Sequence, residues 1–263
     1  MNRIDKKFKE LKERKKKAFI AFITAGDPNL KVTEQLVLAF EASGVDIVEL
    51  GVPFSDPLAD GPVIQASSQR ALKQEVNLRK ILDCVKRIRG KSQIPLALMT
   101  YYNPVFHYGE DQFVADAREA GVDGVIIPDL PPEESKNLIK GAKAQDLSTV
   151  FFISPTTTPE RMKRVVNLST GFIYYVSLTG VTGARNQLSP SITRQVEAAR
   201  KLTDKPICVG FGVSSAEQVS SVSKSADGVI VGSAIINAIV RNTGKRDLVK
   251  NVSRFVARLA CAV

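Results

Sequence analysis

Two carboxylates in contrasting settings are the side chains of this sequence best suited to chemistry. Glu49 lies inside the apolar run Ile47–Leu50, and Asp60 lies in the following loop, which is rich in Pro, Asp and Gly. Burying a carboxylate without a partner is costly, so such a residue usually has a tight partner or a function. Two acids in different environments can acquire different pKa values, and one site can then perform acid and base chemistry together. The alternative is an ion-paired Glu at a strand end, followed by an ordinary turn.

The elements that must position these acids follow from the hydrophobic pattern. Short apolar runs recur along the chain, and each is followed by a turn and a segment with helical periodicity. The pattern predicts eight strands, at Ala18–Thr24, Ile47–Leu50, Leu96–Thr100, Gly124–Pro128, Thr149–Ile153, Phe172–Ser177, Ile207–Gly210 and Gly228–Val231. It predicts intervening helices at Lys31–Ser43, Leu78–Arg89, Gln112–Glu119, Pro132–Ala144, Pro159–Asn167, Ser191–Leu202, Ser215–Ser223 and Asp247–Ala260.

Strands that are apolar throughout and separated by helices indicate parallel pairing with both sheet faces covered. Eight such units in 263 residues predict an α/β protein with the (β/α)8 TIM-barrel fold, formed as a single domain over residues 1–263. A doubly wound open sheet is the alternative, but no GxGxxG motif follows the first strand. An additional N-terminal helix is expected within Met1–Lys17, where Ile4, Phe8 and Leu11 repeat at helical spacing, and we expect it to close the bottom of the barrel.

Composition and charge limit the classes of function. Hydrophobic residues make up 44% of the chain and charged residues 24%, as in ordinary globular proteins. No apolar run approaches the ~18 residues of a membrane span, so we expect a soluble protein with no membrane partner, in the cytoplasm or in an organelle after processing. The net charge of +10 raises the question of nucleic-acid binding. Nine basic residues fall in Met1–Lys17 without a nucleic-acid-binding motif, so a solvated amphipathic helix is the simpler interpretation.

The cysteines and the single histidine argue against a metal centre. Cys84, Cys208 and Cys261 lie far apart without CxxC spacing, which disfavours a zinc site, and their odd number disfavours a disulfide framework. His107 is the only histidine and lies in a Tyr/Phe-rich loop, where a structural role is the more common one. The sequence therefore predicts reduced thiols and no metal.

The predicted barrel gathers several of these residues at one end. A TIM barrel builds its active site from the carboxyl ends of the strands and the loops that follow them. Besides the two acids, this rule selects Phe22, Tyr101, Asp129 and Tyr174. Aromatic and apolar walls with a few acids suit a flat, uncharged ring better than a sugar or an amino acid.

Glycine-rich turns follow the last three predicted strands. They are Gly180–Gly183, Gly210–Gly212 and Gly232–Ser233. Small residues let backbone N–H groups approach an anion closely, and the loops after the seventh and eighth strands are the recurrent phosphate site of this fold. The combination predicts a phosphate-binding end opposite the ring-binding end.

Several segments together resemble one known family. They are Phe22–Pro28, Glu49–Pro57 with Ala59–Pro62, Tyr101–Pro104, Pro128–Pro131, Gly180–Gly183 and Val209–Gly212. In this order, and over the whole length, they are similar to the α subunit of tryptophan synthase. That resemblance implies a TIM-barrel lyase that cleaves indole-3-glycerol phosphate to indole and glyceraldehyde 3-phosphate by a retro-aldol reaction.

The resemblance also implies roles for individual residues. Glu49 is expected to be the general acid and base at indole C3 and at the side-chain hydroxyl, and Asp60 to accept a hydrogen bond from the indole N–H. The implied substrate-binding residues are Phe22, Ile64, Leu98, Tyr101, Asp129, Tyr174, Thr182 and Phe211, and the implied phosphate-binding residues are Gly183, Gly212, Gly232 and Ser233. The loop Thr179–Leu188 is expected to act as a lid that brings Thr182 toward Asp60.

Family members usually work in an α₂β₂ heterotetramer. The resemblance implies a β subunit that carries pyridoxal phosphate and receives indole, and no cofactor in this chain itself. Pro53, Phe54, Asp56 and Asn103–Pro104 lie on the loops expected to face that partner. Two alternatives remain at this point. They are a stand-alone lyase that releases free indole, and a non-catalytic module that binds a phosphorylated ligand or nucleic acid.

Overall fold

Parallel strands form one sheet in this computed structural model, which describes residues 1–176, 190–210 and 212–263. The nine strands found in that part of the chain are β1 (Ala18–Thr24), β2 (Ile47–Gly51), β3 (Leu96–Met99), β4 (Gly124–Ile126), β5 (Ser148–Val150), β6 (Phe152–Ile153), β7 (Ile173–Val176), β8 (Ile207–Gly210) and β9 (Gly228–Val231). Their order in the sheet is β5-β4-β3-β2-β1-β9-β8-β7-β6.

The two ends of this sheet belong to one stretch of chain. Only Phe151 separates β5, which pairs with β4, from β6, which pairs with β7. The carbonyl of Phe151 accepts the N–H of Tyr174 at 3.0 Å, so pairing continues through the junction. The predicted strand Thr149–Ile153 is therefore a strand that changes partner midway, and this change closes the sheet into the predicted TIM barrel.

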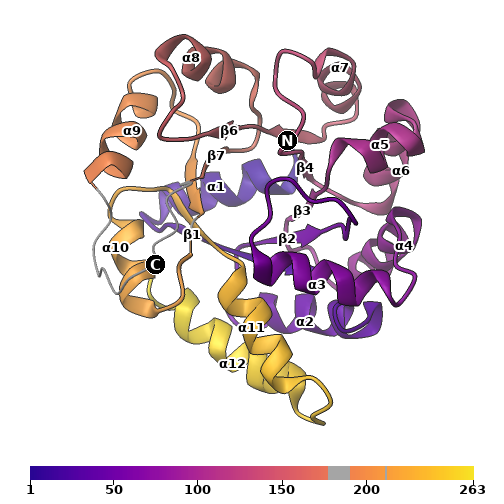
Figure 1. Cartoon of the computed structure of the whole chain (residues 1–263). Helices are drawn as coiled ribbons and strands as arrows, with labels where there is room; N and C mark the ends of the chain where they lie inside the picture. Colours follow the sequence, from indigo (N-terminus) through magenta and orange to yellow (C-terminus); the bar gives the residue numbers. More distant parts are fainter. Residues whose placement is uncertain (177–189, 211) are drawn as a thin grey trace.

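Helices surround the strands, as Figure 1 shows. Their bounds are α1 (Arg3–Glu13), α2 (Leu30–Ala42), α3 (Pro62–Leu72), α4 (Leu78–Arg89), α5 (Tyr102–Tyr108), α6 (Glu110–Ala120), α7 (Lys136–Ala144), α8 (Pro159–Leu168), α9 (Pro190–Arg200), α10 (Ala216–Ser223), α11 (Ser233–Asn242) and α12 (Leu248–Ala260).

Three of these helices, α3, α5 and α11, are not among the predicted ranges, and each follows a strand at the carboxyl end of the barrel strands. α3 begins with Gly61 as its N-cap and Pro62 in its first turn, a favourable start because the missing N–H of proline is not needed there. α7 begins at Lys136, later than the predicted Pro132, because residues 131–134 form a turn closed by the N–H of Glu134 on the carbonyl of Pro131.

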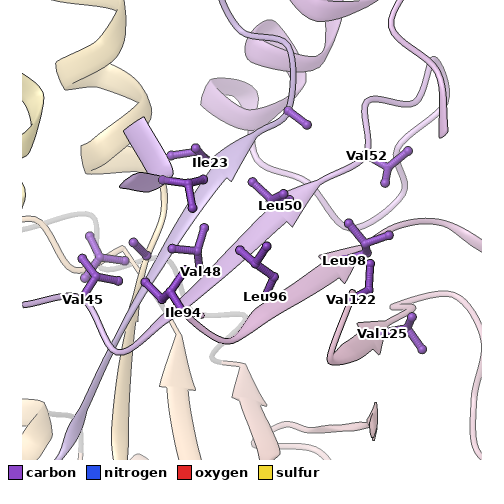
Figure 2. Packing of buried hydrophobic residues seen from close by; sticks show 14 of the residues in the cluster. Ile23, Val45, Val48, Leu50, Val52, Ile94, Leu96, Leu98, Val122 and Val125 are labelled. Carbon is purple, nitrogen blue, oxygen red and sulfur yellow. The ribbon is translucent and has the colours of Figure 1, made fainter. Parts of the chain in front are cut away.

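Each strand separates two hydrophobic layers. The inner layer fills the barrel and contains, among others, Ile20, Ile47, Ala97 and Ile230. The outer layer lies between the strands and the helices, and Figure 2 shows part of it with Ile23, Val48, Leu50, Leu96 and Leu98 labelled. Successive side chains of a strand point to opposite faces. A residue next to an inner-layer residue therefore points outward to the helices, and a residue two positions away points inward again.

The N-terminal helix closes the bottom of the barrel, as predicted. Ile4, Phe8 and Leu11 of α1 are buried in the inner layer, and Figure 1 shows α1 crossing behind the strands. Burial of these three side chains removes apolar surface from water at the end of the barrel opposite the strand tips.

Part of the basic charge of this segment is used in ion pairs. Arg3 contacts Asp123 at 2.9 Å, Lys7 contacts Asp46 at 3.8 Å and Lys17 contacts Asp227 at 3.2 Å. Each of these aspartates directly precedes a strand and accepts a backbone N–H of the neighbouring strand, from Leu96, Phe19 and Ile207 respectively. The predicted amphipathic helix is therefore present, and these three partly exposed cations also hold the helix and its following segment to the barrel.

Candidate active site

Glu49 points into the barrel from the middle of β2. Ile47 belongs to the inner layer, so Glu49, two residues further along the strand, faces the same way. The side chain is fully buried, and neither carboxylate oxygen has a hydrogen-bond partner among the described residues. Burial without compensation raises the pKa of Glu49 to about 8. At neutral pH the group holds a proton, and the described part of the chain offers no cation for the alternative of an ion-paired Glu.

Asp60 lies in the loop between β2 and α3, and its environment differs from that of Glu49. The side chain is half-buried, and burial raises its pKa, while a hydrogen bond with the Tyr101 hydroxyl acts in the opposite direction. The two carboxyls therefore differ in solvation and in hydrogen bonding. Such a difference lets one acid remain protonated while the other carries charge.

A narrow cavity joins Asp60 to the end of the barrel. Its walls come from the ends of β1, β2 and β3 and from α3, and the lining residues are Phe22, Thr24, Gly51, Val52, Asp60, Ile64, Ser68, Met99, Thr100 and Tyr101. The close approach of Phe22 to β2 depends on glycine, because a Cβ on Gly51 would lie 2.6 Å from the Phe22 ring. The structure thus brings Phe22, Ile64 and Tyr101 together with Asp60, as expected from the sequence.

Tyr174 closes the opposite side of the barrel interior. Its ring packs on Phe152 in a tilted arrangement with 4.8 Å between centroids, and a Cβ on Gly210 would lie 2.6 Å from its hydroxyl oxygen. Burial raises the pKa of Tyr174 well above its ordinary value, and the nearby charge of Glu49 acts in the same direction. The phenol therefore stays neutral and presents a polar group to an otherwise apolar wall.

Asp129 is placed differently from the other predicted residues. It is exposed, and one of its carboxylate oxygens accepts the backbone N–H of Tyr102 at 2.9 Å. Tyr102 is the first residue of α5, and an acceptor there satisfies an N–H that has no partner within the helix. In this structure Asp129 thus fixes the start of α5, directly after Tyr101.

The glycine-rich end of the barrel is described in part. Gly212 has φ +30° and open space where a Cβ would stand, and Gly232 is the N-cap of α11, with no side chain bonded to that cap among the described residues. Ser233 is the first residue of the same helix. Since β8 and β9 are adjacent, the turns that follow them lie at one side of the barrel mouth. A helix N-terminus of this kind favours anions.

Three predicted site residues, Thr182, Gly183 and Phe211, lie outside the described residues, as does the loop predicted as a lid.

The prediction for Leu98 is wrong about the direction of its side chain. Leu98 is fully buried in the outer layer with Leu50 and Leu96 (Figure 2) and so faces the helices. The neighbouring Met99 packs on the inner layer and lines the cavity. β3 is apolar on both faces, so composition did not reveal its orientation, although counting back two residues from Tyr101 selects Met99.

Sequence reasoning missed three hydroxyl-bearing residues that line the cavity, Thr24, Ser68 and Thr100. Thr24 and Thr100 lie at the ends of predicted strands, and Ser68 lies in α3, which was not predicted to be helical. The pattern that could have found Ser68 is its position one helical turn after Ile64 in α3, because residues four apart share a helix face.

Neither a metal-binding cluster nor a membrane-spanning helix is found among the described residues. No group of three or more His, Cys, Asp or Glu side chains is arranged there to hold a metal ion. None of the helices in residues 1–176, 190–210 and 212–263 combines the length and apolar character required to cross a membrane.

Known proteins resemble this chain along its whole length. The family model described as "Tryptophan synthase alpha chain" matches residues 8–263. A protein of Geotalea daltonii named tryptophan synthase alpha chain is 48% identical over 263 residues, with 100% of this chain and 99% of that protein covered. A protein of the same name from Geobacter sulfurreducens is 49% identical, with the same coverage.

Solved structures of tryptophan synthase chains also superimpose on this chain. Tryptophan synthase subunit alpha from Legionella pneumophila strain Paris superimposes with a TM-score of 0.93 at 38% identity, covering 100% of this chain and 98% of that one. A chain from the tryptophan synthase complex of Pyrococcus furiosus superimposes with a TM-score of 0.84 at 37% identity, covering 92% of this chain and 97% of that one.

Proposed function

This chain belongs to the tryptophan synthase alpha chain family, whose members are lyases of tryptophan biosynthesis, and on this basis we propose that it cleaves indole-3-glycerol phosphate with Glu49 and Asp60 as the catalytic pair. The observation that carries this proposal is the fully buried carboxyl of Glu49, which has no hydrogen-bond partner among the described residues, in the same barrel mouth as the half-buried Asp60. The products are indole and glyceraldehyde 3-phosphate.

The reaction requires one proton to move in and one to move out. Glu49 begins protonated, because burial raises its pKa to about 8, and it donates this proton to indole C3. The positive charge that develops on the ring nitrogen is stabilised by the Asp60 carboxylate, which accepts the ring N–H. Loss of the side-chain hydroxyl proton to Glu49 then forms the aldehyde, and the electron pair of the broken C–C bond returns to the ring. Glu49 ends the cycle with its proton restored.

We propose that the cavity binds the indole ring and that the glycine-rich turns bind the phosphate. Phe22, Ile64, Met99 and Tyr174 supply apolar and aromatic surface for the ring. At the other end, Gly212, Gly232 and Ser233 offer backbone N–H groups, with Gly183 as a further expected contact and Thr182 and Phe211 as expected ring-side contacts. A phosphate at the N-terminus of α11 would be stabilised by the unsatisfied N–H groups of its first turn.

The assay that tests this function follows indole release from indole-3-glycerol phosphate, first by the purified chain and then after addition of a tryptophan synthase β subunit. We expect slow turnover by the chain alone and faster turnover with the partner. Fast turnover alone, unaffected by the partner, would instead favour the stand-alone lyase, which the names of the relatives do not favour. An absence of indole in both assays would contradict the substrate assignment.

We propose a β subunit as the partner, in an α₂β₂ heterotetramer, with pyridoxal phosphate on that partner and no cofactor in this chain. The name of the Pyrococcus furiosus complex supports an assembly. We place the protein in the cytoplasm and treat residues 1–263 as one domain, which is supported by the single sheet that contains all described strands. Nucleic-acid binding is disfavoured because Arg3, Lys7 and Lys17 are engaged in ion pairs.

The proposed docking surface includes the loops named from the sequence and two exposed apolar residues. Leu58 is 87% exposed in the loop before α3, and Phe106 is 69% exposed on α5 beside the Asn103–Pro104 segment. Large apolar side chains that are this exposed are common anchors of protein interfaces.

Truncating Phe106 to Ala should weaken binding of the β subunit by about tenfold, because fully burying such a side chain is worth roughly 1.5–3 kcal/mol. The affinity can be measured by titrating β subunit into the α chain and following activation of indole release. Leu202→Ala is the matched control, since Leu202 is also exposed but precedes β8 at the opposite end of the barrel. Equal affinities for the Phe106→Ala, Leu202→Ala and wild-type chains would contradict this docking surface.

A further inference from the structure

We propose that Asp27 and Arg70 are positioning residues for the reaction, and that their ion pair fixes helix α3, one wall of the ring-binding cavity, against the loop after β1. Asp27 lies in the Phe22–Pro28 segment, but it neither lines the cavity nor belongs to the proposed catalytic pair. This inference rests on the proposed function, because the wall that the pair fixes is the one assigned to the indole ring. Neither residue is assigned a contact with substrate.

Three hydrogen bonds converge on the Asp27 carboxylate. Arg70 donates from Nε to Oδ1 at 2.9 Å and from Nη2 to Oδ2 at 2.6 Å. The Ser67 hydroxyl donates to the same Oδ2 at 2.6 Å. Asp27 is 2% exposed, whereas the Arg70 side chain is 37% exposed. A two-point contact between a planar guanidinium and a carboxylate fixes orientation as well as distance, which a single hydrogen bond does not do.

The ion pair joins two walls of one cavity. On the side of β1, the backbone N–H of Asp27 donates to the carbonyl of Thr24 at 3.3 Å, and Thr24 lines the cavity. On the other side, Arg70 belongs to α3, whose Ile64 and Ser68 line the same cavity. These two residues are four apart and so share one face of the helix. The contact of Arg70 with Asp27 therefore sets how far α3 lies from the end of β1.

Helix α3 has little apolar anchoring of its own. Its buried side chains are Ser67, Ser68 and Ala71, which are all small, whereas α2 and α4 each bury several large apolar side chains. Burial of a small side chain removes little apolar area from water and so holds a helix weakly. Within the described part of the chain, the side-chain hydrogen bonds that tie α3 to another repeat of the barrel are those made with Asp27. The position of α3 therefore depends on this carboxylate.

Asp60 is attached to the start of the same helix. Only Gly61 separates it from Pro62, the first residue of α3. The side-chain amide of Gln65 donates to the carbonyl of Asp60 at 2.8 Å, and the backbone N–H of Gln65 donates to the carbonyl of Gly61 at 3.0 Å. A shift of α3 would thus move the proposed catalytic acid together with the ring wall, and small misplacements of reacting groups are costly in rate.

The test is Arg70→Lys, which keeps a positive charge beside the buried Asp27 but loses the two-point contact. Affinity for indole, measured by calorimetric titration of the full chain, should fall by about tenfold, and kcat for indole formation should also fall by about tenfold. Affinity for glycerol 3-phosphate, which probes the glycine-rich turns, should stay unchanged. A general loss of stability would not separate the two ligands in this way.

Arg87→Lys is the matched control. Arg87 of α4 contacts Glu34 of α2 at 3.2 Å, and neither residue lines the cavity. The same chemical change there should leave the affinity for indole and kcat as in the wild-type chain.

Asp27→Asn tests the pair from its other member. Because Arg70 is partly exposed, this variant leaves no charge buried without a partner, and it serves as the test if Arg70→Lys does not fold. We expect a similar loss of indole affinity. Combining both substitutions should add little to either loss, because each removes the same contact.

Hydrogen exchange of the backbone amides of α3 measures the hold on this helix without substrate or turnover. Arg70→Lys should speed exchange within residues 62–72 of the free chain by about tenfold and leave exchange in α4 unchanged. Arg87→Lys should leave exchange in α3 unchanged. Thermal melting of each variant establishes that the fold is retained.

The outcomes separate this inference from the proposed function. Unchanged indole affinity and kcat in folded Arg70→Lys and Asp27→Asn chains would overturn the positioning role. An equal loss of affinity for indole and for glycerol 3-phosphate would also overturn it, because that result indicates general damage to the barrel. If the wild-type chain neither binds nor releases indole, the proposed function fails, while amide exchange in α3 still decides whether the ion pair fixes this wall.

Discussion

Replacing Glu49 by Gln should lower the kcat of indole formation by about 10²–10⁴-fold, the usual contribution of a positioned general acid or base. Gln has nearly the same shape and fits the same inner-layer position on β2, but it has no proton to donate to indole C3 and cannot accept one from the substrate hydroxyl. Single-turnover and steady-state assays of indole release would measure the loss. We expect binding of a non-cleavable substrate analogue to change little, because the walls of the cavity and the glycine-rich turns are untouched.

Glu134→Gln is the matched control for this loss, since it makes the same chemical change at an exposed position. It should leave kcat unchanged. If Glu49→Gln retained near-normal turnover, the proton would have to come from another group, and the assignment of Glu49 as the acid would be wrong.

Replacing Glu49 by Met should make the chain more stable, and the gain should grow with pH. Burial in the folded chain raises the Glu49 pKa to about 8, from its ordinary value of 4.5. The folded state therefore binds this proton more tightly than the unfolded state does. Stability from this group is fully present below pH ~4.5 and is lost as the pH rises through about 8. Each pH unit between the two pKa values is worth about 1.4 kcal/mol, so the loss amounts to a few kcal/mol, to order of magnitude.

Methionine carries no charge and fills a similar volume in the apolar inner layer, so the variant should not show this loss. Urea unfolding of wild-type chain and variant at several pH values from 5 to 9 would measure it. Only the difference between the two chains is interpreted, because other titrating groups contribute equally to both. A difference that does not change with pH would contradict the pKa of about 8 for Glu49.

The two predictions for Glu49 share one cause. The desolvation that keeps its proton in place for catalysis also makes the folded state less stable at neutral and alkaline pH. A more stable but inactive Glu49→Met chain would show that stability is lost at this position in return for function, as is common at active sites.

The sequence by itself determined the repeating pattern of strands and helices, the barrel and the helix at its bottom. These features depend on local periodicity and on the number of repeating units, and both can be recognised in the sequence without a structure. It also singled out Glu49, because a lone acid within an apolar run stands out without knowledge of its neighbours. The glycine-rich turns could be named for the same reason.

Only the tertiary structure decided which face of β3 lines the cavity. Leu98 and Met99 are adjacent and apolar, and both faces of a barrel strand are buried, so their alternation carries no visible signal. The change of partner at Phe151 and the ion pairs of Arg3, Lys7 and Lys17 likewise depend on residues far apart in the chain. The hydrogen bond from the Ala59 N–H to the Tyr101 hydroxyl joins two loops that meet only when β2 and β3 pair. Such contacts are set by how strands pair in space, which local patterns do not encode.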